Sequence, residues 1–237
     1  GYAKALHVRA DILAYADRFD ESYRDYFEAQ SLYRALEHAP GIAWCDYGLG
    51  YVAQQWGDQE KALEHLTGAA DWYRSHGYVG ETASIEISIG DTMFQLGRFQ
   101  EAIVFAESSI RHFMREGRHL PEAHANLAVS LLALGDVERF KSEVVWVART
   151  ANAQPYFLVL YAGMAALDRD WDKWDELVAQ IQASPAQREL DLAVGYDVMV
   201  HCAGLAAAPD RVAQAQKLAD VQWARLGRQR TVKFSNS

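Results

Sequence analysis

The sequence has few of the residues that build disulfide scaffolds or kinked, proline-rich structures. Its 237 residues include 2 cysteines and 5 prolines. Cys45 and Cys202 lie far apart and do not make a disulfide framework, which favours two small buried thiols in a reducing, cytoplasmic setting. No stretch approaches the roughly 20 apolar residues that a membrane-spanning helix requires. The first residues carry scattered charges in an amphipathic pattern, which is not typical of a signal peptide.

Basic residues are outnumbered, and this excludes a general nucleic-acid-binding surface. The 23 lysines and arginines face 32 acidic residues, for a formal net charge of −9. Binding to phosphates needs clustered positive charge. Half of the residues are hydrophobic, so the chain can bury a core and is not disordered. Because Gly1 already stands inside a predicted helix, we expect a domain of a longer protein.

The sequence also lacks the common catalytic motifs. It contains neither a phosphate-binding Gly-Lys-Ser/Thr loop nor a Gly-x-Ser-x-Gly nucleophile elbow. Asp168, Asp170 and Asp172 have the one-three-five spacing of a calcium loop, but Lys173 and Ala179 replace its glycine and its last carboxylate. Acidic residues at a helix start, which complement the helix dipole, explain the three aspartates better.

A second cluster of polar residues resembles a metal site only superficially. His119 and His124 are five residues apart, whereas the helical zinc motif requires two histidines four apart with a glutamate after the first. Pro121 lies between them and suits the first position of a helix, so we expect a turn and a helix start. The sequence therefore predicts no metal, no cofactor, no catalytic residue and no enzyme activity.

What the sequence does contain is an internal repeat of short turns. Segments 55–62, 95–102 and 133–140 share one pattern: an apolar residue, a glycine, a short turn, an acidic residue and an apolar position five past the glycine. Segment 15–22 follows the same pattern with Asp17 in the place of the glycine. The turn positions 17, 57, 97 and 135 therefore recur at intervals of 40, 40 and 38 residues. A glycine suits this place because it ends a helix in the left-handed conformation.

Small residues recur on both sides of these turns and indicate closely packed helix pairs. One set lies seven residues before each turn position, and the other lies twelve after it. The first set is Ala10, Gly50, Gly90 and Ala128, and the second is Ala29, Ala69, Ser109 and Val147. Apolar residues at helical spacing fill the second helix of each unit. The predicted unit is therefore helix, tight turn, helix.

These positions resemble the tetratricopeptide repeat. The matching residues are Leu49, Gly50, Gly57, Ala62 and Ala69 in one copy and Gly90, Gly97, Phe99 and Ala102 in the next. The family's usual period is about 34 residues, and Asp46 and Glu86 stand where its tryptophan is found. The longer period resembles arrays in bacterial transcription activators of the maltose-activator type and in some signalling ATPases. The resemblance implies an all-α, right-handed superhelical solenoid.

The second half of the sequence can be divided by periodicity alone. We expect an apolar helix at 154–167, a degenerate helix containing Trp171, Trp174 and Val178, and a final pair at 187–204 and 209–226. This makes about six antiparallel helix pairs. We assign residues 1–227 to a single domain. Residues 228–237 carry no helical stripe and are predicted to be a frayed tail or a link to a further segment.

The resemblance also implies which residues recognise a partner. In tetratricopeptide arrays the first helix of each pair lines the concave face. The predicted binding residues are Trp44, Tyr47, Tyr51, Gln54, Gln55, Ser84, Ile87, Asp91 and Asn126, and neighbouring candidates are Lys4, His7, Asp11, Tyr15, Ser88, Phe94, Gln95, Glu122 and Val129. Aromatic side chains beside amides are typical of a recognition surface. Alternatively, Trp44, Tyr47 and Tyr51 pack against the next repeat, because their spacing also fits a core stripe.

Two classes of function follow from this surface. The first is a recognition module that binds a protein or peptide with a neutral, basic or aromatic segment in the concave groove, as the sensor or regulatory part of a larger signalling or transcription-regulator protein. The second is a small-molecule-binding domain or an all-α enzyme, which predicts a closed cavity where His7, Asp11 and Asp91 converge. A self-associating scaffold is a less specific third possibility.

Overall fold

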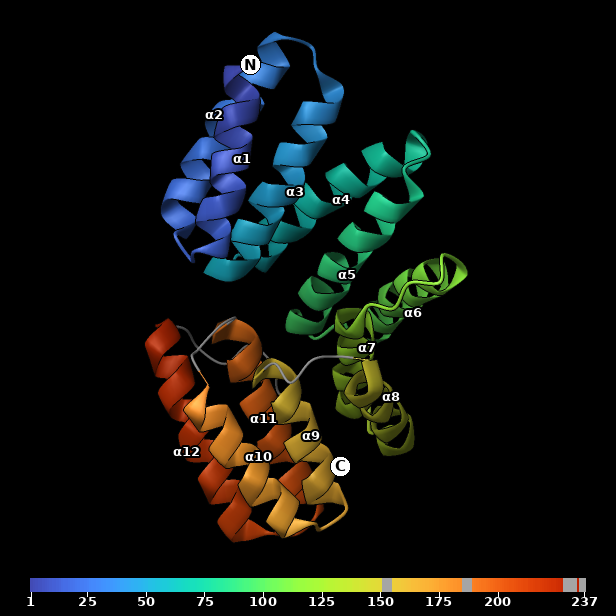
Figure 1. The fold of residues 1–237 in the computed structure, drawn as a ribbon, viewed down its shortest axis with the longest axis vertical. Coiled ribbons are helices and arrows are strands. Elements are labelled where there is room, and N and C mark those ends of the chain that lie inside the picture. The colour runs from blue at the N-terminus through green and yellow to red at the C-terminus, as the bar shows by residue number, and fades with distance from the viewer. Residues whose placement is uncertain (151–154, 185–188, 228–233, 235–237) are drawn as a thin grey trace.

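The protein is an array of α-helices that follows an arc (Figure 1). The computed structural model describes residues 1–150, 155–184, 189–227 and 234, and these residues form twelve helices and no strand. The first six are α1 (Tyr2–Tyr15), α2 (Phe19–Ala35), α3 (Ala39–Trp56), α4 (Gln59–Ser75), α5 (Val79–Gln95) and α6 (Phe99–Arg115). The other six are α7 (Pro121–Ala133), α8 (Val137–Thr150), α9 (Pro155–Leu167), α10 (Trp171–Ala183), α11 (Glu189–Leu205) and α12 (Pro209–Leu226).

The helices pack as six consecutive pairs. Each odd-numbered helix packs against the even-numbered helix that follows it, from α1 with α2 to α11 with α12. In the first four pairs the second helix also packs against the first helix of the next pair, as α2 does on α3 and α4 on α5. In Figure 1 the pairs α1–α4 lie at one end of the arc and α9–α12 at the other. The predicted solenoid of helix pairs is confirmed.

The turns fall where the repeat pattern places them. Asp17, Gly57, Gly97 and Gly135 all adopt the left-handed conformation, with φ of 56°, 82°, 74° and 81°. The connections between pairs also contain a left-handed residue, which the sequence pattern had not indicated. These residues are Glu37, Gly77 and Gly117, with φ of 53°, 77° and 67°. A left-handed residue thus ends most helices, and it lets the chain reverse within two or three residues.

Glu37 is the exception among these connections, and replacing it should stabilise the protein. Glycine stands at the equivalent positions 77 and 117, whereas Glu37 has a side chain, which is exposed. The backbone φ of Glu37 is 53°. A left-handed conformation costs a residue with a Cβ roughly 1–2 kcal/mol. Glycine avoids this cost, but it loses more backbone entropy on folding, which offsets part of the gain. We expect Glu37→Gly to raise the free energy of unfolding by about 0.5–1 kcal/mol. Urea denaturation checks this, and Gly77→Glu should change stability in the opposite direction.

The small residues before the turns allow the two helices of a pair to approach closely. A Cβ on Gly50 would lie 2.7 Å from Cγ of Leu66, and one on Gly90 would lie 3.4 Å from the carbonyl oxygen of Ala102. Ala10 and Ala128 are fully buried at the equivalent places. The second set of small residues, Ala29, Ala69, Ser109 and Val147, is fully buried as well. The close packing predicted from the repeat is therefore present.

The predicted helices of the second half are also present, within a residue or two of their expected ends. They share one large hydrophobic core with α7 and α8, centred on the fully buried Trp174 of α10. Here α9 also packs directly on α11. The predicted tail at 228–237 lies outside the described residues except for Phe234, and the division into domain and tail stays a prediction.

The two polar clusters that resemble metal sites belong to helix starts. The carboxylate of Asp170 accepts a hydrogen bond from the backbone N–H of Lys173 at 3.0 Å and caps α10. Helix α7 begins at Pro121, as predicted. His124 instead bonds to Glu143, with 2.6 Å between Nδ1 and Oε2. In the described part of the chain, no three potential metal ligands gather in one place, and no helix has the length and apolar character to cross a membrane.

Candidate functional site

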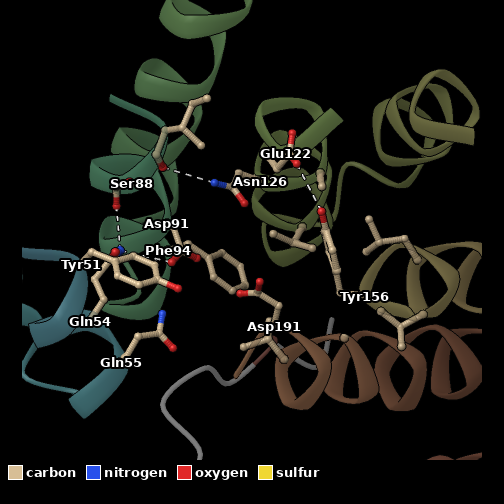
Figure 2. Close-up of a pocket in the computed structure, with 17 residues that line it drawn as sticks. Tyr51, Gln54, Gln55, Ser88, Asp91, Phe94, Glu122, Asn126, Tyr156 and Asp191 are labelled. Carbon is tan, nitrogen blue, oxygen red and sulfur yellow. Dashed lines mark hydrogen bonds between the residues drawn. The ribbon is translucent and has the colours of Figure 1, made fainter. Parts of the chain in front are cut away.

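A pocket lies on the inner side of the arc and is built entirely from first helices of the pairs (Figure 2). Five helices contribute, so the pocket joins parts of the chain from α3 to α11. Its lining comprises Tyr51, Gln54 and Gln55 of α3, Ile87, Ser88, Asp91 and Phe94 of α5, Glu122, Ala125, Asn126 and Val129 of α7, Tyr156, Val159 and Leu160 of α9, and Asp191, Val194 and Gly195 of α11. The cavity volume is about 110 Å³, well below the roughly 300–1,000 Å³ of small-molecule sites.

The pocket is acidic. Asp91, Glu122 and Asp191 project into it from three different helices, and none of the described lining residues is Lys, Arg or His. Carboxylates that share a concave surface with apolar walls produce a focused negative potential. Such a pocket attracts cations and disfavours phosphates and carboxylates.

Buried amides fix the carboxylate of Asp91. Its Oδ2 accepts hydrogen bonds from Nε2 of Gln54 at 3.2 Å and from Nε2 of Gln95 at 3.0 Å. Gln54 also donates to the hydroxyl of Thr92 at 2.7 Å, and Gln59 donates to Gln95 at 2.6 Å. Gln54, Gln59 and Gln95 are each less than 5% exposed. This network therefore sets the position of Asp91 and ties α3 and α4 to α5.

The opposite wall is held by two further polar contacts. The hydroxyl of Tyr156 donates to the carboxylate of Glu122 at 3.2 Å, which links α9 to α7. Asn126 donates through Nδ2 to the carbonyl oxygen of Ile87 at 3.3 Å, which links α7 to α5. Both contacts are drawn in Figure 2. The second one uses an amide proton of Asn126, so this side chain holds α7 against α5.

The structure brings together six of the nine predicted binding residues. Those that line the pocket are Tyr51, Gln54, Gln55, Ile87, Asp91 and Asn126, and the neighbouring candidates Ser88, Phe94, Glu122 and Val129 line it as well. Because Gln54 is only 3% exposed, its part is to support Asp91. Whether the six bind a partner stays a prediction.

Three predicted residues lie outside the pocket. Trp44 packs toward the first pair, with its ring centroid 5.9 Å from that of His7 and 6.4 Å from that of His38. Burial raises the pKa of Tyr47, and a hydrogen bond with Ser88 opposes that shift. Ser84 donates its hydroxyl back to the carbonyl oxygen of Gly80 at 3.1 Å. Trp44 and Tyr47 contact neighbouring helices, but they remain 40% and 36% exposed, so the choice between packing and partner binding stays a prediction for both.

His7, Asp11 and Asp91, which the enzyme alternative expects in one cavity, do not converge. Nε2 of His7 lies 3.4 Å from Oδ2 of Asp11, and the hydroxyl of Tyr26 donates to Asp11 at 2.5 Å. Neither His7 nor Asp11 lines the pocket that contains Asp91. Burial raises the pKa of the Cys45 thiol to about 12, so this cysteine is not an activated nucleophile.

The last two pairs also contribute residues to the pocket, which the repeat pattern of the sequence did not indicate. Tyr156 and Asp191 line the pocket opposite Tyr51 and Gln55 (Figure 2). The turn pattern that located the other residues is recognisable only as far as about residue 150. The periodicity of 154–167 and 187–204 did identify both segments as helices, and extending the alternation of first and second helices through them points to these positions.

Comparison with known proteins supports the repeat architecture. No family model matches the chain. Two kinesin light chain-related proteins of Arabidopsis thaliana, numbered 3 and 2, match at 37% identity over 103 residues and 32% over 89. These matches cover 43% and 38% of this chain but only 16% and 13% of the relatives. The chain therefore matches about one seventh of the length of these curated relatives.

Two solved structures share the fold over nearly the whole chain. The apo form of RapI superposes with a TM-score of 0.78 at 11% identity, covering 95% of this chain and 84% of that one. PilF of Pseudomonas aeruginosa superposes with a TM-score of 0.59 at 16% identity, covering 95% and 91%. With its left-handed turns, its close helix contacts at small residues and a pocket lining made only of first helices, the chain has the same helical-repeat fold as these two structures.

Proposed function

We propose that this protein is a non-catalytic recognition module whose concave pocket binds a peptide segment of a partner protein through a lysine or arginine side chain. The observation that carries the proposal is the set of three carboxylates, Asp91, Glu122 and Asp191, which converge from α5, α7 and α11. A cationic side chain that enters between them gains charge-assisted hydrogen bonds. The cavity of about 110 Å³ suits the end of one such side chain.

The surroundings of the carboxylates suit a peptide. Gln55 and Asn126 offer amide groups that can pair with a peptide backbone, and Tyr51 and Tyr156 offer aromatic area with little loss of side-chain entropy. Because the network around Gln54 and the Tyr156–Glu122 contact already hold the walls, binding does not have to order them.

We also propose that the module serves as the sensor or regulatory part of a larger protein in a reducing, cytoplasmic setting. Two observations support a role within a larger protein. The repeat period is near 40 residues, and the chain matches only 16% and 13% of the length of its curated relatives. Two buried free thiols, Cys45 and Cys202, support the reducing, cytoplasmic setting.

The test is a peptide library in which each position is fixed in turn as lysine, arginine, glutamate or alanine. The parent chain should select lysine or arginine at one position, and the affinity should fall with increasing salt. The double variant Asp91→Asn, Asp191→Asn should bind the selected peptides about tenfold or more weakly, because two charge-assisted contacts are lost.

A control with the same change in net charge is Glu60→Gln, Glu64→Gln, which alters two exposed carboxylates of the outer helix α4. This control should bind as the parent does. Selection of acidic peptides, or equal weakening by both double variants, would show that the pocket is not the binding site.

A further inference from the structure

Phe234, in the segment that follows α12, lies against the inner side of the arc. Its ring stacks on His201 of α11, with 5.0 Å between centroids and 22° between ring planes. The same ring lies 6.3 Å from that of Phe94 on α5, at 54°. Phe234 is partly buried and packs against the core shared by α7–α12 and against a second core formed by buried residues of α3–α7. It therefore bridges the third and sixth helix pairs, which are about 100 residues apart in the sequence.

This place adjoins the acidic pocket. Phe94 contacts Phe234 and also lines the pocket. Val194 of α11 lines the pocket too and packs against the same hydrophobic core as Phe234. An aromatic side chain thus contacts the lining of the acidic pocket, on the face to which we assign partner binding.

The sequence just before Phe234 is basic, as is the side chain that we propose for the ligand of the pocket. Residues 228–233 read Arg-Gln-Arg-Thr-Val-Lys, with three basic residues and no acidic one. These six residues lie outside the part of the chain that the structure describes. Three positive charges immediately before an aromatic anchor complement the three carboxylates of the pocket.

We propose that the segment containing Phe234 is an intramolecular ligand of this groove, and that a partner with basic residues followed by an aromatic residue displaces it. The inference rests on the proposed function and specifies the partner: its aromatic residue takes the position between Phe94 and His201, and its basic residues bind the carboxylates of the pocket. While Phe234 is in place, the groove is partly occupied, and the apparent association constant for a partner equals the intrinsic one multiplied by the fraction of molecules that are open.

The binding test uses a labelled peptide of residues 228–237 as the probe, added to the full chain. The parent should bind it at least about tenfold more weakly than a Phe234→Ala variant, because its own phenylalanine competes for the position. A probe that carries the same phenylalanine-to-alanine change should bind the variant about tenfold more weakly than the unchanged probe does. Equal binding of the probe by parent and variant would overturn the proposal.

A second readout follows His201 by NMR. Burial lowers the pKa of His201, and the stacked Phe234 ring contributes to this burial. In Phe234→Ala the pKa should therefore rise toward the ordinary value near 6.5, and the probe peptide should lower it again. Phe27→Ala, which removes an exposed aromatic residue of α2, should leave it unchanged. An unchanged pKa in Phe234→Ala contradicts the placement of Phe234 and overturns the proposal.

The two proposals fail separately. If the parent selects lysine or arginine peptides through Asp91 and Asp191 but both tests on Phe234 fail, the pocket binds cations and has no intramolecular ligand. If the library shows no selection for basic residues while Phe234→Ala still moves the pKa of His201, Phe234 is a packing residue, and both the proposed function and the intramolecular ligand are wrong.

Discussion

Replacing Trp174 by alanine is expected to lower the free energy of unfolding by about 3–5 kcal/mol, the usual cost of removing a fully buried tryptophan. The side chain is 0% exposed and lies in the core shared by the last six helices. Its indole N–H donates to Oε1 of Gln214 on α12 at 3.0 Å, and this acceptor loses its partner in the variant. Urea denaturation followed by circular dichroism measures the loss.

Trp44→Ala is the matched control, because Trp44 is 40% exposed and packs mainly against histidine rings. It should lose less than half as much stability. If the two variants lose equal amounts, the core around α10 is not the main source of stability in the second half. A larger loss at Trp44 than at Trp174 would contradict the expectation and show that Trp44 is a main structural residue.

Gly195→Ala should destabilise the protein by about 1–3 kcal/mol, the usual cost of overpacking a rigid core. A Cβ at this position would lie 2.0 Å from Cγ2 and 2.8 Å from Cβ of Val159. Val159 is buried and β-branched, so it cannot rotate out of the way. Because Gly195 and Val159 both line the pocket, the separation of α9 and α11 that relieves the clash should also weaken peptide binding.

Gly68→Ala on α4 is the control, since a Cβ there meets no atom within 4 Å. This change should stabilise the protein by about 0.5–1 kcal/mol, because alanine favours a helix interior over glycine. Combining Gly195→Ala with Val159→Ala removes the clash. The double variant should therefore lose less stability than the two single variants lose together. Stabilisation by Gly195→Ala alone would contradict the close contact of α9 with α11.

Much of the fold could be predicted from the sequence because its signals are local. A glycine or aspartate at positions 17, 57, 97 and 135 ends a helix through its own backbone conformation, whatever surrounds it. Alanine and glycine seven residues earlier, at positions such as Ala10 and Gly50, decide how closely the two helices of one pair approach. Both features act within about 20 residues, so a single repeat is enough to reveal them.

The site was only partly predictable, since it depends on how the repeats add up. Alignment to the turns placed Asp91 and Asn126 correctly on the inner face. It also included Trp44 and Tyr47, which lie on the same helix as Tyr51 but outside the pocket lining. The position along the helix decides this difference, and the turn alignment alone does not resolve it.

The sequence by itself determined the helix pairs, their turns and the acidic character of the chain, because each follows from neighbouring residues or from composition. Only the tertiary structure decided which residues share the pocket. The small rotation between successive pairs accumulates along a solenoid, and after three and four further pairs it brings Tyr156 and Asp191, respectively, opposite Tyr51. No single repeat encodes this curvature, so neither the closure of the acidic pocket nor the position of Phe234 beside it could be inferred before the helices were placed in space.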